Sequence, residues 1–336
     1  MAQYNIVCFC GGGIRGLLSA TILENLYTTY PGILKYTDLF AGTSTGSGII
    51  SMILAGMLPS DIVTYFLGKE LTFFQKPTGT GAGEPMYSVA DAYAGQVEMH
   101  YKQELGLAPL SYYGQSVLFT AFNVGSNVGS TGSGGLATTY TPWAPILFSN
   151  LPGSPNSGTT LAEAVTSSSA MPGMLGSCNG NIDGAFVHHD PTLAAIAMAL
   201  SSNPKLTLND INVICIGTGF MANWIASDTS GWGAQQWQDG DGNQDSNTPA
   251  LLLNGTVSPI LNASLSGTST NLVPMLAGMM LPQGQYAYLN PTLGYYIPEN
   301  DTIPADITYL QDQAAECDPQ QMATAEAMLG TYWVAH

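Results

Sequence analysis

Five consecutive residues, Gly42-Thr43-Ser44-Thr45-Gly46, have the composition and spacing that let a serine act as a nucleophile. They follow a short apolar run and precede a helical pattern, so Ser44 would lie on a sharp turn between a strand and a helix. Such a turn projects the hydroxyl away from the backbone. We therefore predict that Ser44 attacks an electrophilic centre such as an ester carbonyl. The elbow around it would be formed by Gly42, Thr43, Thr45 and Gly46.

A second motif, rich in glycine, lies between a predicted first strand and a helical pattern. Backbone N–H groups and the positive end of a helix dipole converge in such a loop, so it can hold an anion. One interpretation is an oxyanion hole, because glycines have no Cβ to keep a tetrahedral intermediate from the backbone. Its residues would be Gly11, Gly12, Gly13, Arg15 and Gly16.

A dinucleotide site is the competing interpretation of this loop. Gly11, Gly13 and Gly16 satisfy the G-x-G-x-x-G pattern of such sites. A ribose-binding carboxylate should then close a second strand near residues 31–36, and no Asp or Glu stands there. The sequence therefore favours the oxyanion hole and predicts no cofactor.

Arg15 is the only arginine of the chain. Because the chain has so few cationic residues, we expect the arginine beside the glycine loop to have a role in that loop. The alternative is an exposed arginine that closes the loop by a hydrogen bond.

Ser44 needs a base, and the sequence offers two kinds. His188 and His189 follow Asp183 in the order of an α/β-hydrolase triad, but they lie too near Asp183 for the usual separate loop. The other histidines are His100 and His336. The alternative base is Asp183 itself, on a polar turn at the edge of a short strand.

Two further patterns could hold a metal. Asp239, Asp241, Asn243 and Asp245 resemble the start of a calcium loop, but Gln244 replaces its glycine and Ala250 its final glutamate. The five cysteines, Cys8, Cys10, Cys178, Cys215 and Cys317, show no zinc spacing and no C-x-x-C pair. We expect a solvated loop, packed cysteines in a reducing compartment, and no required metal.

The composition narrows the possible partners. The 336 residues carry a formal net charge of −17, and only 9% of them are charged, which argues against nucleic acid and against attraction to an anionic membrane. The longest apolar windows, 49–58 and 272–281, fall short of the ~20 residues of a membrane span. The amino terminus lacks a signal pattern. We expect a cytoplasmic protein, with export by a route without a cleaved signal left open.

Strand and helix patterns alternate along the chain, which predicts a mainly parallel sheet covered on both faces. The clearest strands are residues 4–10, 117–124 and 211–216, with a Gly/Ser loop over 125–135. Helices are expected over residues 17–26, 49–57, 60–67, 87–105, 161–169, from Asp190-Pro191 to 200, 273–281 and within 305–332.

Taken together, these motifs resemble the patatin-like phospholipases, which are lipid acyl hydrolases. The similar blocks occur in family order over residues 4–220: Cys10–Gly16 (family D-G-G-G-x-R/K-G), Gly42–Gly46 (G-T-S-x-G), Ser169–Pro172 (S-A-x-P), Asp183–Ala185 (D-G-G/A), His189–Leu193 (N-N-P-T), Ile216–Gly219 and, more weakly, Asn290-Pro291. The chain departs from the family at Cys10, where aspartate is usual, and at Asp190, where asparagine is usual.

The resemblance implies one three-layer α/β domain over residues 1–336, with helical and loop additions over 221–336. It implies a catalytic dyad in which Asp183, on a turn with Gly184 and Ala185, accepts the Ser44 proton. An aspartate has a reference pKa of about 3.9, so burial must raise it for this task. The substrates would be phospholipids, lysophospholipids or galactolipids, met by peripheral membrane or micelle contact. A non-catalytic lipid-binding or storage protein of the same fold is the alternative from another class.

Overall fold

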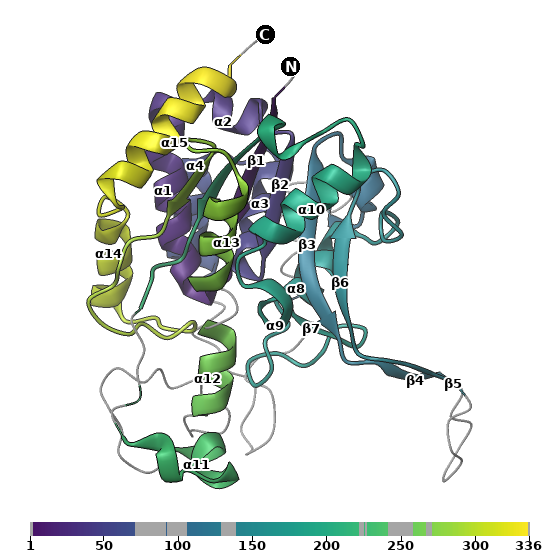
Figure 1. Cartoon of the computed structure of the whole chain (residues 1–336), viewed down its shortest axis with the longest axis vertical. Coiled ribbons are helices and arrows are strands. Elements are labelled where there is room, and N and C mark those ends of the chain that lie inside the picture. Colours follow the sequence, from purple (N-terminus) through teal and green to yellow (C-terminus); the bar gives the residue numbers. More distant parts are fainter. Residues whose placement is uncertain are drawn as a thin grey trace.

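A twisted sheet in the order β6-β3-β2-β1-β8-β9 forms the centre of the computed structural model, and β7 pairs with β3 as a seventh strand (Figure 1). The structure describes residues 3–70, 92, 106–128, 139–221, 225, 227–240, 258–266 and 271–334. The strands are β1 (Tyr4–Phe9), β2 (Leu39–Thr43), β3 (Ser116–Asn123), β6 (Ala144–Ser149), β7 (Asn181–Asp183), β8 (Ile211–Ile216) and β9 (Tyr286–Leu289).

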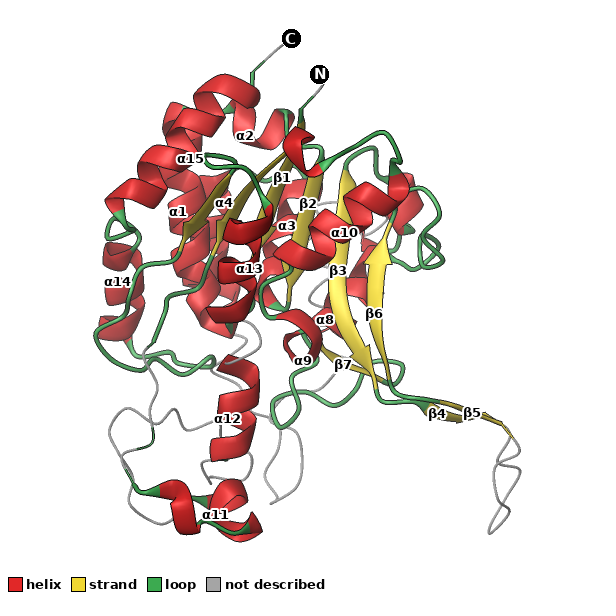
Figure 2. Ribbon diagram, in the orientation of Figure 1, coloured by secondary structure: helices red, strands yellow, loops and turns green. Residues whose placement is uncertain are grey.

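Five neighbouring strands of this sheet, from β3 to β9, run parallel, while β6 and β7 run antiparallel to β3. All residues of β2 and β8 are buried, as is typical of strands with helices on both faces. The expected three-layer α/β fold with a mostly parallel sheet is therefore confirmed (Figure 2).

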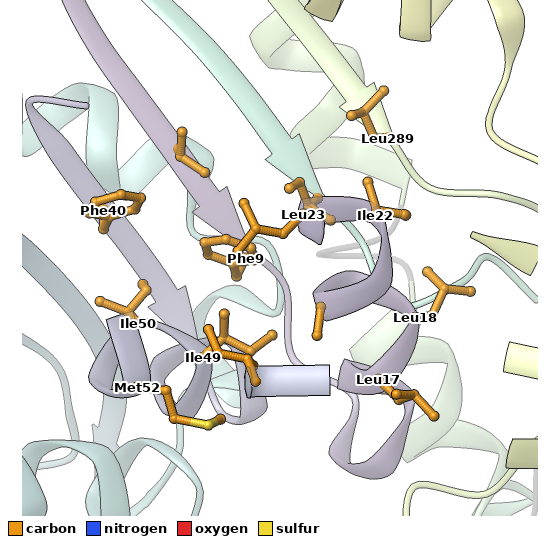
Figure 3. Close-up of a cluster of buried hydrophobic side chains, with 14 of the residues drawn as sticks. Phe9, Leu17, Leu18, Ile22, Leu23, Phe40, Ile49, Ile50, Met52 and Leu289 are labelled. Carbon is orange, nitrogen blue, oxygen red and sulfur yellow. The ribbon is translucent and has the colours of Figure 1, made fainter. Parts of the chain in front are cut away.

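One face of the sheet is covered by helices from both ends of the chain. These are α1 (Gly16–Thr29), α3 (Thr45–Leu54), α8 (Leu161–Ser168), α14 (Pro304–Gln313) and α15 (Pro319–Tyr332), and α4 (Pro59–Tyr65) packs on α1. Side chains of β1, β2, α1 and α3 interdigitate there, with Phe9 at the centre of the close-up (Figure 3). Each such buried side chain stabilises the fold by roughly 1.5–3 kcal/mol.

The other face is covered by α10 (Thr192–Ser202) and α13 (Leu272–Met280). Because successive residues of a strand point to opposite faces, Val7 and Phe9 join the first core, whereas Ile6, Cys8 and Cys10 join the second. Three cysteines therefore lie in this second layer, since Cys215 of β8 is beside Cys8.

Shorter elements complete the described chain. They are α2 (Gly32–Lys35), α9 (Ala185–His188), α11 (Ala234–Asp239), α12 (Pro259–Ser266), the 3-10 turns Gly13–Arg15, Leu110–Tyr112, Leu208–Asp210 and Thr229–Gly231, and a π-helical turn over Phe66–Glu70. A two-stranded ribbon of β4 (Ser126–Val128) and β5 (Thr139–Thr141) extends from the main body (Figure 1). No helix among the described residues combines the length and apolar character that a membrane span requires.

Several elements differ from the sequence predictions. Residues 126–128 form a strand where a loop was expected, because β5 supplies the partner that no local pattern reveals. Beyond residue 220, β9 joins the central sheet beside β8, so this region contributes more than helices and loops. Helix α4 begins at Pro59 rather than after a Ser60-Asp61 cap. The helix predicted over 87–105 lies outside the described residues, apart from position 92.

Candidate active site

Ser44 lies where β2 passes into α3, on a turn that leaves no room for side chains on either side. Its backbone has φ 54°, a left-handed conformation that is rare for a residue with a side chain. A Cβ on Gly42 would meet the backbone of Gly46 at 2.6 Å, and a Cβ on Gly46 would overlap the Phe9 carbonyl. The glycines on both sides of the serine are therefore steric requirements of the elbow.

Two serine side chains hold the elbow in place. The Ser44 N–H donates to the Ser168 hydroxyl at 2.9 Å, and the Ser47 hydroxyl donates to the Ser44 carbonyl at 2.6 Å. Ser168 ends α8, so a residue far away in sequence fixes the backbone of the turn. This anchor was not foreseen, although Ser168 directly precedes the S-A-x-P block.

The register of β3 brings Asp183 to the same place. On one edge of β3, Thr43 of β2 is opposite Thr120, and Asp183 of β7 is opposite the next residue, Ala121. Strand β7 thus continues along β3 from the point where β2 ends. Ser44, one residue beyond Thr43, consequently lies beside Asp183.

The Asp183 turn is fixed by its backbone. The Asp183 N–H donates to the Ala170 carbonyl at 2.9 Å, and the Gly184 N–H donates to the Ser168 carbonyl at 3.0 Å. A Cβ on Gly184 would overlap the Thr120 carbonyl, so only glycine fits there. These contacts explain why an S-A-x-P block and a D-G-A turn occur together.

The Asp183 carboxylate is almost fully buried. It accepts the Ala185 N–H at 2.8 Å, and the Ser44 hydroxyl lies close enough to lower its pKa. Burial raises the pKa of Asp183 to about 7, the hydrogen bonds from Ala185 and Ser44 lower it, and the charge of Glu299 raises it. A carboxylate tuned to this range can accept a proton near neutral pH.

A hydroxyl network joins the elbow to the segment after the aspartate. The Thr43 hydroxyl donates to the His188 carbonyl at 2.6 Å and lies 2.8 Å from the Thr120 hydroxyl. Both threonines are buried. They keep the ends of β2 and β3 against the segment that follows Asp183.

The glycine loop packs directly against Ser44. A Cβ on Gly11 would lie 3.2 Å from the Ser44 Cβ, so the loop backbone and the Ser44 side chain are in close contact. The Thr218 hydroxyl, which follows β8, donates to the Gly11 carbonyl at 2.6 Å. Gly12 has φ 150° and Gly13 has φ 57°, conformations that favour glycine.

The loop amides differ in what they can still bind. The Gly11 N–H donates to the His189 carbonyl at 3.0 Å, and the Gly16 N–H donates to carbonyls of its own turn. Among the described residues, the N–H groups of Gly12 and Gly13 have no hydrogen-bond partner. The expectation that Gly11 and Gly16 supply oxyanion donors is therefore corrected, because both amides are already engaged.

Arg15 has a structural position beneath the loop. Its guanidinium Nη1 donates to the Ile297 carbonyl at 2.8 Å, and Nη2 lies 3.5 Å from Glu299 Oε1. The Ile14 N–H donates to the Glu299 carbonyl at 2.7 Å. Arg15 is buried, which contradicts the exposed alternative. Its contacts fasten residues 297–299 to the loop.

Gly16 allows helices α1 and α3 to pack closely. A Cβ at this position would overlap the Thr45 hydroxyl, so glycine lets the start of α1 approach the start of α3. Thr45 itself is the first residue of α3 and lies directly after the nucleophile.

The two described histidines flank the site. The His189 ring lies within 3.5 Å of the position that a Cβ on Gly11 would take, and burial together with Arg15 lowers the pKa of His189 to about 4. His188 is half-buried, and desolvation lowers its pKa. Both imidazoles are therefore neutral near pH 7. His100 and His336 lie outside the described residues.

The calcium pattern is largely outside the described part of the chain. Asp239 is the last residue of α11, and the positions from 241 to 250 are not described. Residues that sequence reasoning missed at the serine site are Ser168, Thr120, Thr218 and Glu299. Ser168 directly precedes the S-A-x-P block and Thr218 lies within the block Ile216–Gly219, whereas no motif pointed to Thr120 or Glu299.

Known proteins resemble this chain over most of its motif blocks. The family model "Patatin-like phospholipase" matches residues 7–196, more than half of the chain. CotR of Bacillus subtilis (strain 168) is 29% identical over 236 residues, covering 69% of this chain and 68% of CotR. Protein teg of Priestia megaterium is 28% identical over 236 residues, covering 69% of each chain. The crystal structure of VipD from Legionella pneumophila aligns with a TM-score of 0.46 at 11% identity, covering 99% of this chain and 67% of VipD.

Proposed function

The chain belongs to the patatin-like phospholipase family, as its motifs indicated, and on that premise we propose that it hydrolyses carboxylic esters of lipids through an acyl-enzyme on Ser44. The observation that carries the proposal is the meeting of three groups at one edge of the sheet. They are a serine with a left-handed backbone, a buried carboxylate close to its hydroxyl, and two loop amides without hydrogen-bond partners in the described part of the chain.

In the first step, the Asp183 carboxylate accepts the Ser44 proton while Oγ attacks the ester carbonyl carbon. The carbonyl π-electrons move onto oxygen, and the N–H groups of Gly12 and Gly13 stabilise the resulting oxyanion. A donor of this kind is worth about 10²–10³ in turnover, so the pair compensates for the weakness of a lone carboxylate as a base.

In the second step, the tetrahedral intermediate collapses, and protonated Asp183 gives its proton to the departing alcohol oxygen. The acyl group remains on Ser44 Oγ. A water molecule then gives a proton to Asp183 and attacks the acyl carbonyl, and the second collapse returns the proton to Ser44. The carboxylate is a base, then an acid, in each half of the cycle.

A bilayer or micelle surface is the proposed setting of the substrate. Helix α13 contacts α10 and β9, buries Val273 and Ala277, and has no charged residue. Its other face is exposed and apolar, formed by Leu272, Met275, Met279 and Met280. With a net charge of −17, contact through these side chains is favoured over contact through charge. Phospholipids, lysophospholipids and galactolipids are the candidate substrates.

The activity is tested with nitrophenyl acyl esters and with phospholipid vesicles. Ser44→Ala should abolish turnover, because no other described group lies at the elbow with a nucleophilic oxygen held by Asp183. The matched control is Ser51→Ala, farther along α3, whose hydroxyl donates only to the Gly48 carbonyl at 2.7 Å. Equal rates for wild type and Ser44→Ala would contradict the enzyme and favour a lipid-binding or storage protein.

The surface contact is tested separately by sedimentation with phosphatidylcholine vesicles. Met279→Asp should weaken binding roughly tenfold, because one buried methionine is worth about 1.5–3 kcal/mol. Leu107→Asp is the control, since Leu107 is also exposed but lies outside α13, before β3. Equal binding by both variants, or a strong rise in binding to anionic vesicles at low salt, would contradict the contact.

A further inference from the structure

A second cluster of chemically active side chains lies in the other layer of the molecule. Cys8 and Cys10 point to the same face of β1, Cys215 of β8 is in register with Cys8, and Asp190 precedes α10. All four residues are buried, with Asp190 only 1% exposed. The reaction proposed for Ser44 uses none of them.

The distances in this cluster are those of a coordination sphere. Cys10 Sγ lies 3.6 Å from Cys215 Sγ, and Cys215 Sγ lies 3.4 Å from Asp190 Oδ1. The ligand atoms of the three residues are all within 4.8 Å of one another. A tetrahedral zinc site with Zn–S of about 2.3 Å and Zn–O of about 2.0 Å has edges of about 3.8 Å between sulfurs and about 3.5 Å between sulfur and oxygen.

The carboxylate in this cluster is incompletely satisfied. Asp190 Oδ1 accepts the Thr192 N–H at 2.9 Å, while the buried Oδ2 accepts no hydrogen bond among the described residues. The single salt bridge found in that part of the chain, between Arg15 and Glu299, does not involve Asp190. A buried carboxylate with one oxygen unpaired is costly, so the Asp190 side chain points to a missing positive partner.

We propose that Cys10, Cys215 and Asp190 form a binding site for one Zn²⁺ ion, which goes beyond the esterase function and does not depend on it. Binding would form two Zn–S bonds and one Zn–O bond, and the two thiol protons would leave to solvent. Zinc fits better than calcium or magnesium, because two of three ligands are thiolates. Cys8 and the Thr192 hydroxyl, which face the same atoms, are the nearest candidates for the fourth position.

The location gives such an ion a structural role. Cys10 directly precedes Gly11, Cys215 lies three residues before Thr218, and Asp190 follows His189. Thr218 and His189 are the two residues that hold the Gly11 backbone by hydrogen bonds. The ion would therefore tie together the three segments that fix the glycine loop. Because the ligands come from separate elements, no spacing in the sequence reveals them.

The test is reconstitution of the full chain, since the site is buried. Wild type is unfolded and refolded under reducing conditions with Zn²⁺, dialysed, and analysed for bound metal and for thermal stability. Stoichiometric zinc and a raised melting temperature are expected. The double variant Cys10→Ala/Cys215→Ala should lose the zinc, whereas Cys317→Ala, which removes a buried cysteine elsewhere, should keep it.

Refolding wild type with Co²⁺ keeps the proposal testable if the double variant does not fold. A thiolate-to-cobalt charge-transfer band in the near ultraviolet is expected, and it should disappear on addition of excess Zn²⁺. Wild type that binds no zinc and gives no such band would overturn the proposal. So would a mass lower by two hydrogen atoms after purification under reducing conditions, which would show a Cys10–Cys215 disulfide instead of a metal site.

Discussion

Asp183 and Asp190 are two buried carboxylates seven residues apart, and they differ in the side chains that they face. Each accepts the N–H of the residue two positions later, Asp183 from Ala185 at 2.8 Å and Asp190 from Thr192 at 2.9 Å. Burial is the largest cause that raises the pKa of both. Asp183 faces the hydroxyl of a partly exposed serine, whereas Asp190 faces buried thiols.

The difference shows that burial alone does not assign a role to a carboxylate. An oxygen nucleophile at a surface turn, with free amides beside it, suits proton transfer to and from a substrate. Two thiols without access to solvent suit a metal or simple packing. The partner and its exposure therefore distinguish the two aspartates, although their own backbone turns are alike.

Replacing the first carboxylate should give the largest effect. Asp183→Asn keeps the shape but cannot accept a proton, so kcat for an acyl ester should fall by about 10²–10⁴ while the fold stays intact by circular dichroism. Asp210→Asn is the control, because Asp210 is also buried but caps a turn at Thr207 before β8. Substantial turnover by Asp183→Asn would show that Asp183 is not the catalytic base.

A substitution that displaces the N–H groups of Gly12 and Gly13 should give the second-largest loss of kcat. Gly12→Ala would place a Cβ into Thr218 and strain a backbone at φ 150°, displacing the loop N–H groups. We expect kcat to fall by about 10²–10³ in steady-state assays, the loss typical of one oxyanion donor. Gly48→Ala is the matched control, since a Cβ there meets nothing within 4 Å. A Gly12→Ala enzyme with normal kcat would show that these amides do not stabilise the intermediate.

The pH dependence of kcat/KM tests whether Asp183 is the base. Since Asp183 must be ionised to accept a proton, kcat/KM should rise with pH through an apparent pKa of about 7. Glu299→Gln removes a negative charge that raises this pKa, so the rise should shift to lower pH. A profile that is flat from pH 5 to pH 8, or one shifted upward by Glu299→Gln, would contradict Asp183 as the base.

Protein stability should depend on pH in the opposite sense. The pKa of Asp183 is about 7 when folded and about 3.9 when unfolded, so the folded chain binds this proton more tightly. The stability that results is complete below about pH 4 and is lost as pH rises to about 7. Denaturant unfolding of wild type and Asp183→Asn across this range isolates the contribution of this group.

Substitution of the histidines gives the smallest expected effect. His188→Ala, His189→Ala, His100→Ala and His336→Ala should each retain substantial activity, because Asp183 already contacts Ser44. His189→Ala is expected to lose the most, since its ring packs on Gly11 beside the nucleophile. A collapse of any one variant to the Ser44→Ala level, with the fold intact, would replace the dyad by a Ser-His-Asp triad.

The local parts of the site could be predicted from sequence. A strand, its glycine loop and a serine elbow are contiguous, so residue type and spacing describe them directly. The contacts of Arg15 and Gly11 could not be predicted, because they depend on which distant strands become neighbours. The pairing of β9 with β8 and the thiol cluster depend on strand order in the same way.

The end of the described chain also has a consequence for synthesis on the ribosome. The Trp333 indole donates to the Thr37 hydroxyl at 2.8 Å, and the Asn5 amide donates to the Tyr332 carbonyl at the same distance. Residues 297–299, which hold Arg15 and Ile14, are likewise translated late. Such long-range contacts form only after these late residues have emerged from the ribosome. A nascent chain therefore lacks the support of the glycine loop until residues 297–299 have been translated.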